Sequence, residues 1–267
     1  MSETPFYLPI GDEVTVFRAA WEARLPVLLK GPTGCGKTRF VEFMASTLPR
    51  RDDAATHEPL VTVACHEDLT GSDLVGRYLI KSDETVWIDG PLTRAVRHGS
   101  VCYLDEIVEA RKDTVVIIHP LTDHRRLLPI DKTGELLEAH PDFLLVLSFN
   151  PGYQSVLKDL KHSTRQRFVA IDFTYPSRDL EAQIIARESS VDGPAALQLA
   201  TLGEKVRHLT ASGLGEGVST RLLIYAGLLM RRGIPARRAC TVAVSHALTD
   251  DTDSQRAIDD VIGAIFG

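Results

Sequence analysis

The sequence has few cysteines and no long apolar run, and these absences exclude several classes of protein. Its four cysteines stand singly among 267 residues, without a C-x-x-C pair, so the spacing favours neither a disulfide framework nor a zinc knuckle. They are expected to be buried thiols in a reducing cytosol. No stretch of about 18 apolar residues occurs, which excludes a membrane-spanning helix. Residues 1–5 are acidic and polar, unlike a secretion signal, so we expect a cytoplasmic protein without a membrane partner.

Basic clusters and histidine pairs are also scarce. Thirty Lys and Arg residues face 36 Asp and Glu residues, which gives a formal net charge of −6. The basic doublets at 50–51, 231–232 and 237–238 do not extend into a stripe, and this argues against nucleic acid as a partner. The nine histidines are dispersed, with no pair four residues apart. A histidine-based metal site is therefore not expected.

The composition and the order of apolar segments predict two domains. A hydrophobic fraction of 44% and a charged fraction of 25% are ordinary for a globular protein. Short apolar runs that alternate with helical patterns predict an α/β fold, whose central sheet is mostly parallel, five-stranded and flanked by helices. The expected strands are residues 26–30, 60–64, 101–105, 143–147 and 168–171. After Pro176 only helical patterns follow, so we expect an α/β core over residues 1–176 and a small all-helical domain over 177–267.

A complete phosphate-loop motif follows the first expected strand. The motif G-x-x-x-x-G-K-[ST] is matched by Gly31, Pro32, Thr33, Gly34, Cys35, Gly36, Lys37 and Thr38. Glycines let successive backbone N–H groups turn towards a phosphate, and the following helix N-terminus adds a positive partial charge. Lys37 is expected to reach the β- and γ-phosphates and the Thr38 hydroxyl to bind Mg²⁺. The pattern predicts a nucleotide site for Mg-ATP, with Cys35 as a small filler.

Two adjacent carboxylates end the third expected strand. In phosphate-loop proteins a carboxylate at such a strand end holds Mg²⁺, usually through water, and Asp105 fits this role. Because side chains alternate along a strand, Glu106 is expected to point elsewhere and to act as the general base on the attacking water. The alternative is an ordinary strand end that leads into an acidic loop.

Further polar residues become candidates for the nucleotide site once the phosphate loop and the two carboxylates are recognised. Asn150 ends the fourth expected strand and could hydrogen-bond the γ-phosphate or the attacking water, or simply start an Asn-Pro turn. Arg165 and Arg167 precede the fifth strand, where an arginine could reach a neighbouring subunit's γ-phosphate or belong to a solvated basic turn. Arg221 lies early in an expected helix, where a cation is unfavourable unless it meets a partner such as phosphate.

Taken together these residues resemble the conserved set of the AAA+ ATPases. In chain order, residues 31–38, Asp105 with Glu106, Asn150, Arg165 with Arg167, and Arg221 look like Walker A, Walker B, sensor 1, the arginine finger and sensor 2. Within AAA+ proteins the chain resembles the MoxR branch and, there, the CbbQ/NorQ group. The runs that carry this closer match are residues 25–42, 128–135, 139–143 and 148–154. The resemblance implies a homo-hexameric ring with ATP at the subunit interfaces and a helical lid.

The resemblance also implies a function in remodelling other proteins. CbbQ proteins act with CbbO, an adaptor that has a von Willebrand A domain, to reactivate Rubisco by releasing tightly bound sugar phosphates. NorQ proteins instead support the maturation of nitric oxide reductase. Residues 65–78 and 158–168 look closer to CbbQ, so we expect Rubisco as the client. A phosphate-loop kinase for a small molecule is a further alternative, but it does not need Glu106, Asn150 and Arg167 together.

Two insertions match the MoxR pattern. Residues 79–90 form a polar excursion with an isolated Trp87, and residues 127–137 are typical of a hairpin around a turn at 131–134. By resemblance these are the helix-2 insert and the pre-sensor hairpin, which face the pore or a partner. The alternative is a pair of ordinary surface loops. A loop that grips a protein more often carries exposed aromatic residues, and here only Tyr78 and Trp87 qualify.

Overall fold

The fold is that of a computed structural model, which describes residues 4–49, 58–81, 84–151, 161–210 and 217–267. Within these ranges the chain separates into two compact units. The first comprises residues 1–32 and 37–173, and the second comprises residues 33–36 and 174–267. Each unit is considered by itself.

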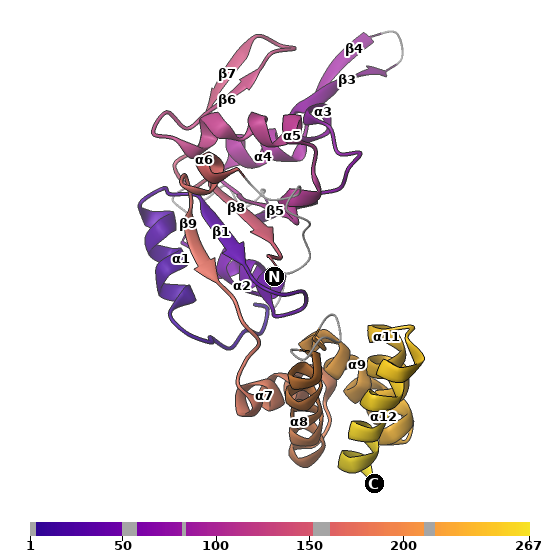
Figure 1. Cartoon of the computed structure of the whole chain (residues 1–267). Coiled ribbons are helices and arrows are strands. Elements are labelled where there is room, and N and C mark those ends of the chain that lie inside the picture. Colours follow the sequence, from indigo (N-terminus) through magenta and orange to yellow (C-terminus); the bar gives the residue numbers. More distant parts are fainter. Residues whose placement is uncertain (1–3, 50–57, 82–83, 152–160, 211–216) are drawn as a thin grey trace. The chain divides into compact units, whose positions relative to one another are not determined.

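A five-stranded parallel sheet forms the centre of the first unit (Figure 1). Its spatial order is β2 (Leu60–Ala64), β5 (Val101–Asp105), β8 (Leu144–Phe149), β1 (Val27–Lys30) and β9 (Val169–Asp172). All four strand pairs are parallel. The predicted α/β fold and its five strands are confirmed. Because β5, β8 and β1 are neighbours, their carboxyl ends meet at one edge, where α/β sheets bind ligands.

Helices flank this sheet, and most of them contribute apolar side chains to the core. They are α1 (Glu13–Glu22), α2 (Lys37–Thr47), α3 (Gly71–Val75), α4 (Pro91–His98), α5 (Lys112–Ile117) and the short α6 (His162–Arg165). Two single-turn 3₁₀ segments, Ile107–Glu109 and His119–Thr122, lie beside α5 in the chain. Leu92 and Val96 of α4 pack with Leu104 of β5 in one buried cluster. Phe40 of α2 meets Phe17 of α1 edge to face, with ring centroids 5.2 Å apart, so aromatic packing joins these two helices.

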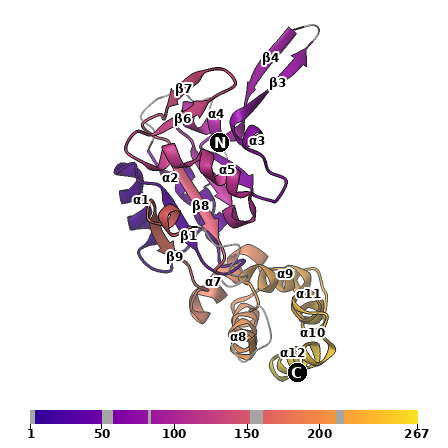
Figure 2. The same cartoon turned by 45° about the horizontal axis from the view of Figure 1, so that its top comes forward.

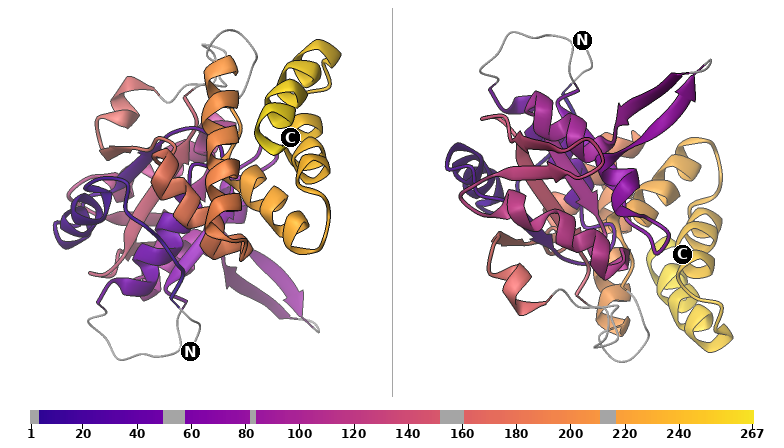
Figure 3. Two further views of the ribbon diagram at one scale, coloured as in Figure 1. Left: turned by 90° about the horizontal axis from the view of Figure 1, so that it is seen from below. Right: turned by 90° about the horizontal axis from the view of Figure 1, so that it is seen from above.

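Two antiparallel hairpins are added to the first unit. The β3–β4 hairpin pairs Gly76–Lys81 with Glu84–Asp89, and it projects from the rest of its unit (Figures 1, 2 and 3). The β6–β7 hairpin pairs Leu127–Ile130 with Glu135–Glu138. The sequence pattern at 79–90 did not reveal β3 and β4, because this hairpin buries little. Its apolar runs, residues 78–80 and 86–88, are only three residues long, and Ile80, for example, is 83% exposed.

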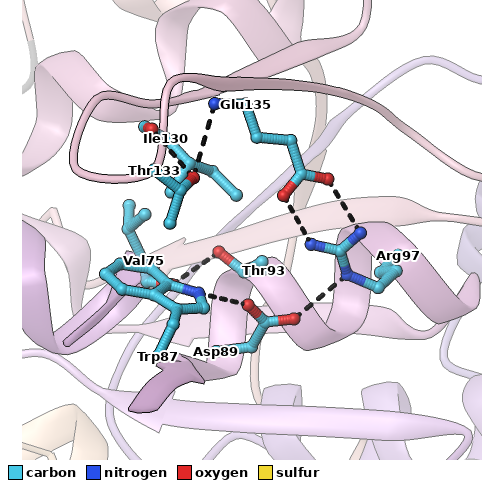
Figure 4. A network of polar contacts seen from close by, with 8 residues as sticks. All are labelled: Val75, Trp87, Asp89, Thr93, Arg97, Ile130, Thr133 and Glu135. Carbon is cyan, nitrogen blue, oxygen red and sulfur yellow. Dashed lines mark hydrogen bonds and ion pairs between the residues drawn. The ribbon is translucent and has the colours of Figure 1, made fainter. Parts of the chain in front are cut away.

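A polar network around Arg97 of α4 joins the two hairpins (Figure 4). Its Nε donates to Asp89 at the end of β4 at 3.0 Å. Its two terminal nitrogens donate to the carboxylate oxygens of Glu135 in β7 at 2.8 and 3.0 Å. The hydrogen bond with Glu135, followed by that with Asp89, raises the pKa of Arg97, and the same contact with Arg97 lowers the pKa of Glu135. Asp89 also accepts from Trp87 Nε1 at 2.7 Å. One guanidinium therefore holds both hairpins on α4.

The secondary structure described in the second unit is entirely helical. It contains α7 (Arg178–Ser189), α8 (Gly193–Thr210), α9 (Thr220–Arg231), α10 (Ala236–Cys240), a π-helical turn (Thr241–Ser245), α11 (His246–Leu248) and α12 (Thr252–Phe266). Leu199, Leu202 and Val206 of α8 are buried in its core, as their spacing predicts. On α7 the spacing of Leu180 and Ile184 predicts a shared apolar face, but both are only half-buried, and the buried face lies one residue further on. None of the helices described in either unit is long and apolar enough to cross a membrane.

Candidate active site

The phosphate loop leaves β1 and enters α2 through glycines that no other residue can replace easily. At Gly31 an added Cβ would lie 2.4 Å from the carbonyl oxygen of Phe173, so the backbone passes too close for a side chain. Gly36 has φ +105°, which L residues rarely adopt, and an added Cβ there would meet no atom within 4 Å. Open space therefore lies directly beside the loop backbone. This cradle fits a phosphate group.

Lys37 is held across this loop. It is the first residue of α2 and is buried. Its Nζ donates to the carbonyl oxygens of Gly31 at 2.7 Å and Pro32 at 2.9 Å. An ammonium group has three donors, and these two acceptors are neutral carbonyls, which do not balance its charge. A phosphate chain in the cradle would supply the balancing charge, so Lys37 and the loop fit a nucleotide.

Asp105 lies at the end of β5, where two hydroxyl groups fix its carboxylate. Tyr103 Oη donates to Oδ1 at 2.7 Å, and Ser148 Oγ of β8 donates to the same oxygen. Burial raises the pKa of Tyr103, and the charge of Asp105 raises it further, so the phenol stays protonated and acts as a donor. The Thr38 side chain acts in the opposite direction and lowers the pKa of Tyr103. The two predicted Mg²⁺ residues, Thr38 and Asp105, therefore share a neighbour.

Glu106 does not continue the strand. Its backbone has φ +55° and ψ +49° and begins the turn at Ile107–Glu109. The alternation expected from strand geometry therefore does not apply to its side chain, which is exposed because the chain turns away after Asp105. A non-glycine residue in the left-handed region is uncommon and costs about 1 kcal/mol or more. Such strain persists where the surroundings hold it, and here the Glu106 N–H donates to Ser148 Oγ at 3.1 Å.

Asn150 follows directly after β8 and is buried. The residue before it, Phe149, pairs with Lys30 of β1, and its carbonyl oxygen accepts from Gly31 N at 3.3 Å. The polar end of β8 therefore lies beside the start of the phosphate loop. On its other side β8 pairs with β5. The fold thus brings the loop, Asn150, Asp105 and Glu106 to one edge of the sheet.

The two arginines before β9 differ in their surroundings. Arg165 is half-buried, and its guanidinium lies over the Phe149 ring, 5.3 Å from the centroid. Arg167 is exposed, and one of its terminal nitrogens makes a long contact of 3.5 Å with the carbonyl oxygen of His119. Burial lowers the pKa of His119, and the charge of Arg167 lowers it further. Arg165 is thus engaged with its own subunit, and Arg167 faces solvent.

Arg221 belongs to the second unit, where it is exposed in the first turn of α9. The N-cap of this helix is Ser219, whose side chain accepts from Leu222 N at 3.4 Å. The hydroxyl of Thr220 donates to buried Glu181 at 2.6 Å. The start of α9, and with it Arg221, is fixed within its own unit.

Sequence reasoning missed Tyr103 and Ser148. Each is a polar residue within an apolar run, and each stands two positions before a candidate residue, Asp105 or Asn150. Residues two apart on a strand face the same side, so this spacing was the signal that could have found them. Among the described residues, no three His, Cys, Asp or Glu side chains are grouped to hold a metal ion. Mg²⁺ at Thr38 and Asp105 would therefore depend on phosphate oxygens and water, as is usual for this ion.

Comparison with known proteins agrees with this geometry. A family model described as AAA domain (dynein-related subfamily) matches residues 26–168, and one described as CbbQ/NirQ/NorQ C-terminal matches residues 181–265. The chain belongs to the CbbQ/NirQ/NorQ family of MoxR-type AAA+ ATPases. This membership speaks against a small-molecule kinase.

Relatives in this family match almost end to end. Protein NorQ of Paracoccus denitrificans is 59% identical over 265 residues, which covers 99% of this chain and 95% of that protein. Protein CbbQ of Hydrogenophilus thermoluteolus is 54% identical over 262 residues, covering 98% and 95%. The denitrification regulatory protein NirQ of Pseudomonas aeruginosa is 54% identical over 259 residues, covering 97% and 96%. The expected preference for the CbbQ group gains no support from these identities.

Solved structures show the AAA+ fold at low identity. A point mutant of RuvB from Thermotoga maritima has a TM-score of 0.54 and 19% identity, and the match covers 95% of this chain and 71% of that one. A putative ATPase from Cytophaga hutchinsonii has a TM-score of 0.52 and 15% identity, covering 94% and 80%. These likenesses concern the fold alone.

Proposed function

We propose that this family member hydrolyses Mg-ATP as one subunit of a cytoplasmic homo-hexameric ring and uses the energy to remodel another protein. The observation that carries the proposal is the meeting of the phosphate loop, Asp105, Glu106 and Asn150 at the carboxyl ends of β1, β5 and β8. Residues 177–267 serve as the helical lid, with Arg221 as its phosphate-sensing residue.

Each residue at this edge has a task in hydrolysis. Bound Mg-ATP supplies the phosphate chain and the metal's positive charge. Lys37 and the loop amides hold the phosphates, while Thr38 and Asp105 hold the metal, Asp105 partly through water. Asn150 orients the attacking water, and the exposed carboxylate of Glu106 accepts its proton as the water oxygen bonds to the γ-phosphorus and ADP departs.

Arg167 is the better candidate for the finger that completes a neighbouring subunit's site. An arginine that acts on another subunit must leave its own surface, and Arg167 is exposed whereas Arg165 lies on the Phe149 ring. We assign Arg165 to support of its own sheet edge. Mixed rings test this: Arg167→Ala subunits should regain hydrolysis when combined with Glu106→Gln subunits, which supply an intact arginine. Rescue of Arg165→Ala but not of Arg167→Ala subunits would reverse the assignment.

The two hairpins are suited to contact a partner. Tyr78, Ile80 and Leu136 are 47%, 83% and 61% exposed, so apolar side chains face solvent on both hairpins. Trp87, by contrast, is half-buried and bonded to Asp89, which leaves Tyr78 as the aromatic group on this surface. We propose that this hairpin pair meets an adaptor with a von Willebrand A domain, as the resemblance to CbbQ and its CbbO partner suggests.

The client is proposed to be Rubisco blocked by a tightly bound sugar phosphate. The second candidate is nitric oxide reductase during its maturation, and the 59% identity to NorQ, against 54% to CbbQ, favours it. Both clients require the same motor, so the client must be decided by assay rather than by the active site.

Two measurements test the proposal in order. Glu106→Gln should retain ATP binding and lose hydrolysis by about 10²-fold or more, and an unchanged turnover would contradict the general-base assignment. With an adaptor present, the wild-type ring should then restore carboxylation by inhibited Rubisco in an ATP-dependent way. Restoration of nitric oxide reductase instead would select the second candidate. Reactivation by the ring without any adaptor would contradict the adaptor-dependent mechanism.

A further inference from the structure

Ser148 is a buried polar residue that connects two neighbouring strands. It lies in the central strand β8 and is 0% exposed. Its hydroxyl donates to Asp105 Oδ1 and accepts from the backbone N–H of Glu106 at 3.1 Å. A single hydroxyl group therefore hydrogen-bonds with both the Asp105 carboxylate and the Glu106 N–H at the end of β5.

The contact with Asp105 orients its carboxylate. Ser148 Oγ and Tyr103 Oη both donate to Oδ1. Among the hydrogen bonds of the described residues, none reaches Oδ2 of Asp105. The carboxylate is therefore held by one oxygen while the other is left for a ligand, as a metal-bound water would require.

The contact with Glu106 holds the backbone turn. Glu106 has φ +55° and ψ +49°, a conformation that the chain leaves readily unless a contact fixes it. The bond from its N–H to Ser148 Oγ provides such a contact. Because this turn decides where the Glu106 side chain leaves the sheet, Ser148 also acts on the position of that carboxylate.

We propose that Ser148 is a positioning residue for hydrolysis, which sets the Asp105 carboxylate and the Glu106 turn together. The proposal rests on the proposed function, since it assumes that Asp105 and Glu106 serve hydrolysis. Tyr103 is the second positioning residue, and its hydroxyl donates to Asp105, whereas the Glu106 N–H is bonded to Ser148. Ser148 also stands two residues before Asn150, which directly follows β8, so the strand that leads to Asn150 is bonded directly to both carboxylate residues.

Removal of the hydroxyl tests the proposal. Ser148→Ala should raise hydrogen exchange at the Glu106 amide by about tenfold in the nucleotide-free protein, because the amide loses its acceptor. The kcat should fall by about tenfold or more, and the Mg²⁺ concentration for half-maximal hydrolysis should rise severalfold. The affinity for ADP without Mg²⁺ should stay within about twofold, since Lys37 and the loop are untouched. Ser148→Thr, which keeps a hydroxyl, should restore most of the kcat.

Two controls separate positioning from stability. Ser100→Ala removes another buried hydroxyl of the same unit, which donates to the carbonyl oxygen of Glu58 at 2.6 Å, and should leave kcat and Mg²⁺ dependence unchanged. Tyr103→Phe should raise the Mg²⁺ requirement without changing exchange at Glu106. This variant also keeps the test possible if Ser148→Ala does not fold.

Different results would contradict the role of Ser148 and the proposed function. Wild-type kcat and Mg²⁺ dependence in Ser148→Ala, with Glu106→Gln inactive, would overturn the positioning role and leave the proposed function standing. If Ser148→Ala does not fold, a wild-type Mg²⁺ requirement in Tyr103→Phe would overturn the shared orientation of Asp105. Full activity of Glu106→Gln would instead contradict the proposed function itself.

Discussion

Glu181 of α7 offers the sharpest test of how the helical unit is held together. Its side chain is fully buried and accepts three hydrogen bonds. Two come from the terminal nitrogens of Arg207, at 2.9 and 2.5 Å, and one from the Thr220 hydroxyl at 2.6 Å. Arg207 in turn donates through Nε to the carbonyl oxygen of Val218 at 2.9 Å. One carboxylate therefore connects α7, α8 and the start of α9.

The magnitude follows from burial of the ion pair. Glu181→Ala would leave the Arg207 cation, only 14% exposed, without its carboxylate, and the Thr220 hydroxyl without its acceptor. Removal of one partner from a buried pair costs about 3–5 kcal/mol, because the remaining charge stays desolvated. Solvent screening lowers this cost only slightly, because the Arg207 side chain is so little exposed. The double variant Glu181→Ala/Arg207→Ala should lose clearly less than the sum of the two single variants.

Hydrogen exchange is the suitable assay, because a chain of two units does not have to unfold in one step. The free energy of opening should fall by about 3–5 kcal/mol for amides of α7, α8 and the first turn of α9. Asp179→Ala is the matched control on the same helix, since that carboxylate is 77% exposed and should change the value by less than about 0.5 kcal/mol. A loss below about 1 kcal/mol in Glu181→Ala would refute the reasoning.

Three further predictions concern the two hairpins, the phosphate loop and the segment before α1. Arg97→Ala should raise hydrogen exchange in both hairpins by about tenfold, because its three partly exposed contacts contribute about 1 kcal/mol. Arg94→Ala, at an exposed position of the same helix, is the control. A change in one hairpin alone would contradict the shared contact. Gly36→Ala should weaken nucleotide binding by at least about tenfold while the circular dichroism spectrum stays unchanged. The reason is that φ +105° is strained for alanine and that the methyl group enters the open cradle. Wild-type affinity would argue against the cradle. Burial raises the pKa of Glu13, but hydrogen bonds from Tyr7 and three backbone amides outweigh burial and lower the pKa. The stability that Glu13 contributes is therefore full above its unfolded pKa and lost as the pH falls through the lower folded value. Glu13→Gln should remove this acid dependence from protease cleavage of residues 7–11.

Much of the fold could be predicted because its central strands β1, β5 and β8 are buried on both faces. Such strands appear as continuous apolar runs, and each was found within two residues of its ends. The β3–β4 hairpin could not be found in this way, because its apolar runs at 78–80 and 86–88 are only three residues long and partly exposed. On α7 the apolar spacing of Leu180 and Ile184 was misleading, because a buried glutamate takes the inner position. Its partner Arg207 lies 26 residues away, and no local pattern reveals such a pairing.

The candidate site shows the same division. Residues 31–38 form a contiguous motif, so a phosphate site could be predicted without knowledge of the fold. Strand alternation gave a wrong reason for the position of Glu106, whose left-handed backbone ends the strand. The N–H of Glu106 is hydrogen-bonded to Ser148, 42 residues further along the chain.

By itself the sequence determined the phosphate loop, the apolar strands, the helical second part and the resemblance to AAA+ ATPases, because each is encoded within a short stretch or in the order of motifs. Only the tertiary structure decided that β8 lies between β5 and β1, which brings Ser148 to Asp105 and Asn150 beside the loop. It also decided that Arg97 joins the two hairpins. The physical reason is that strand order and long-range ion pairs depend on contacts between segments far apart in the chain, where side chains acquire their burial and partners together.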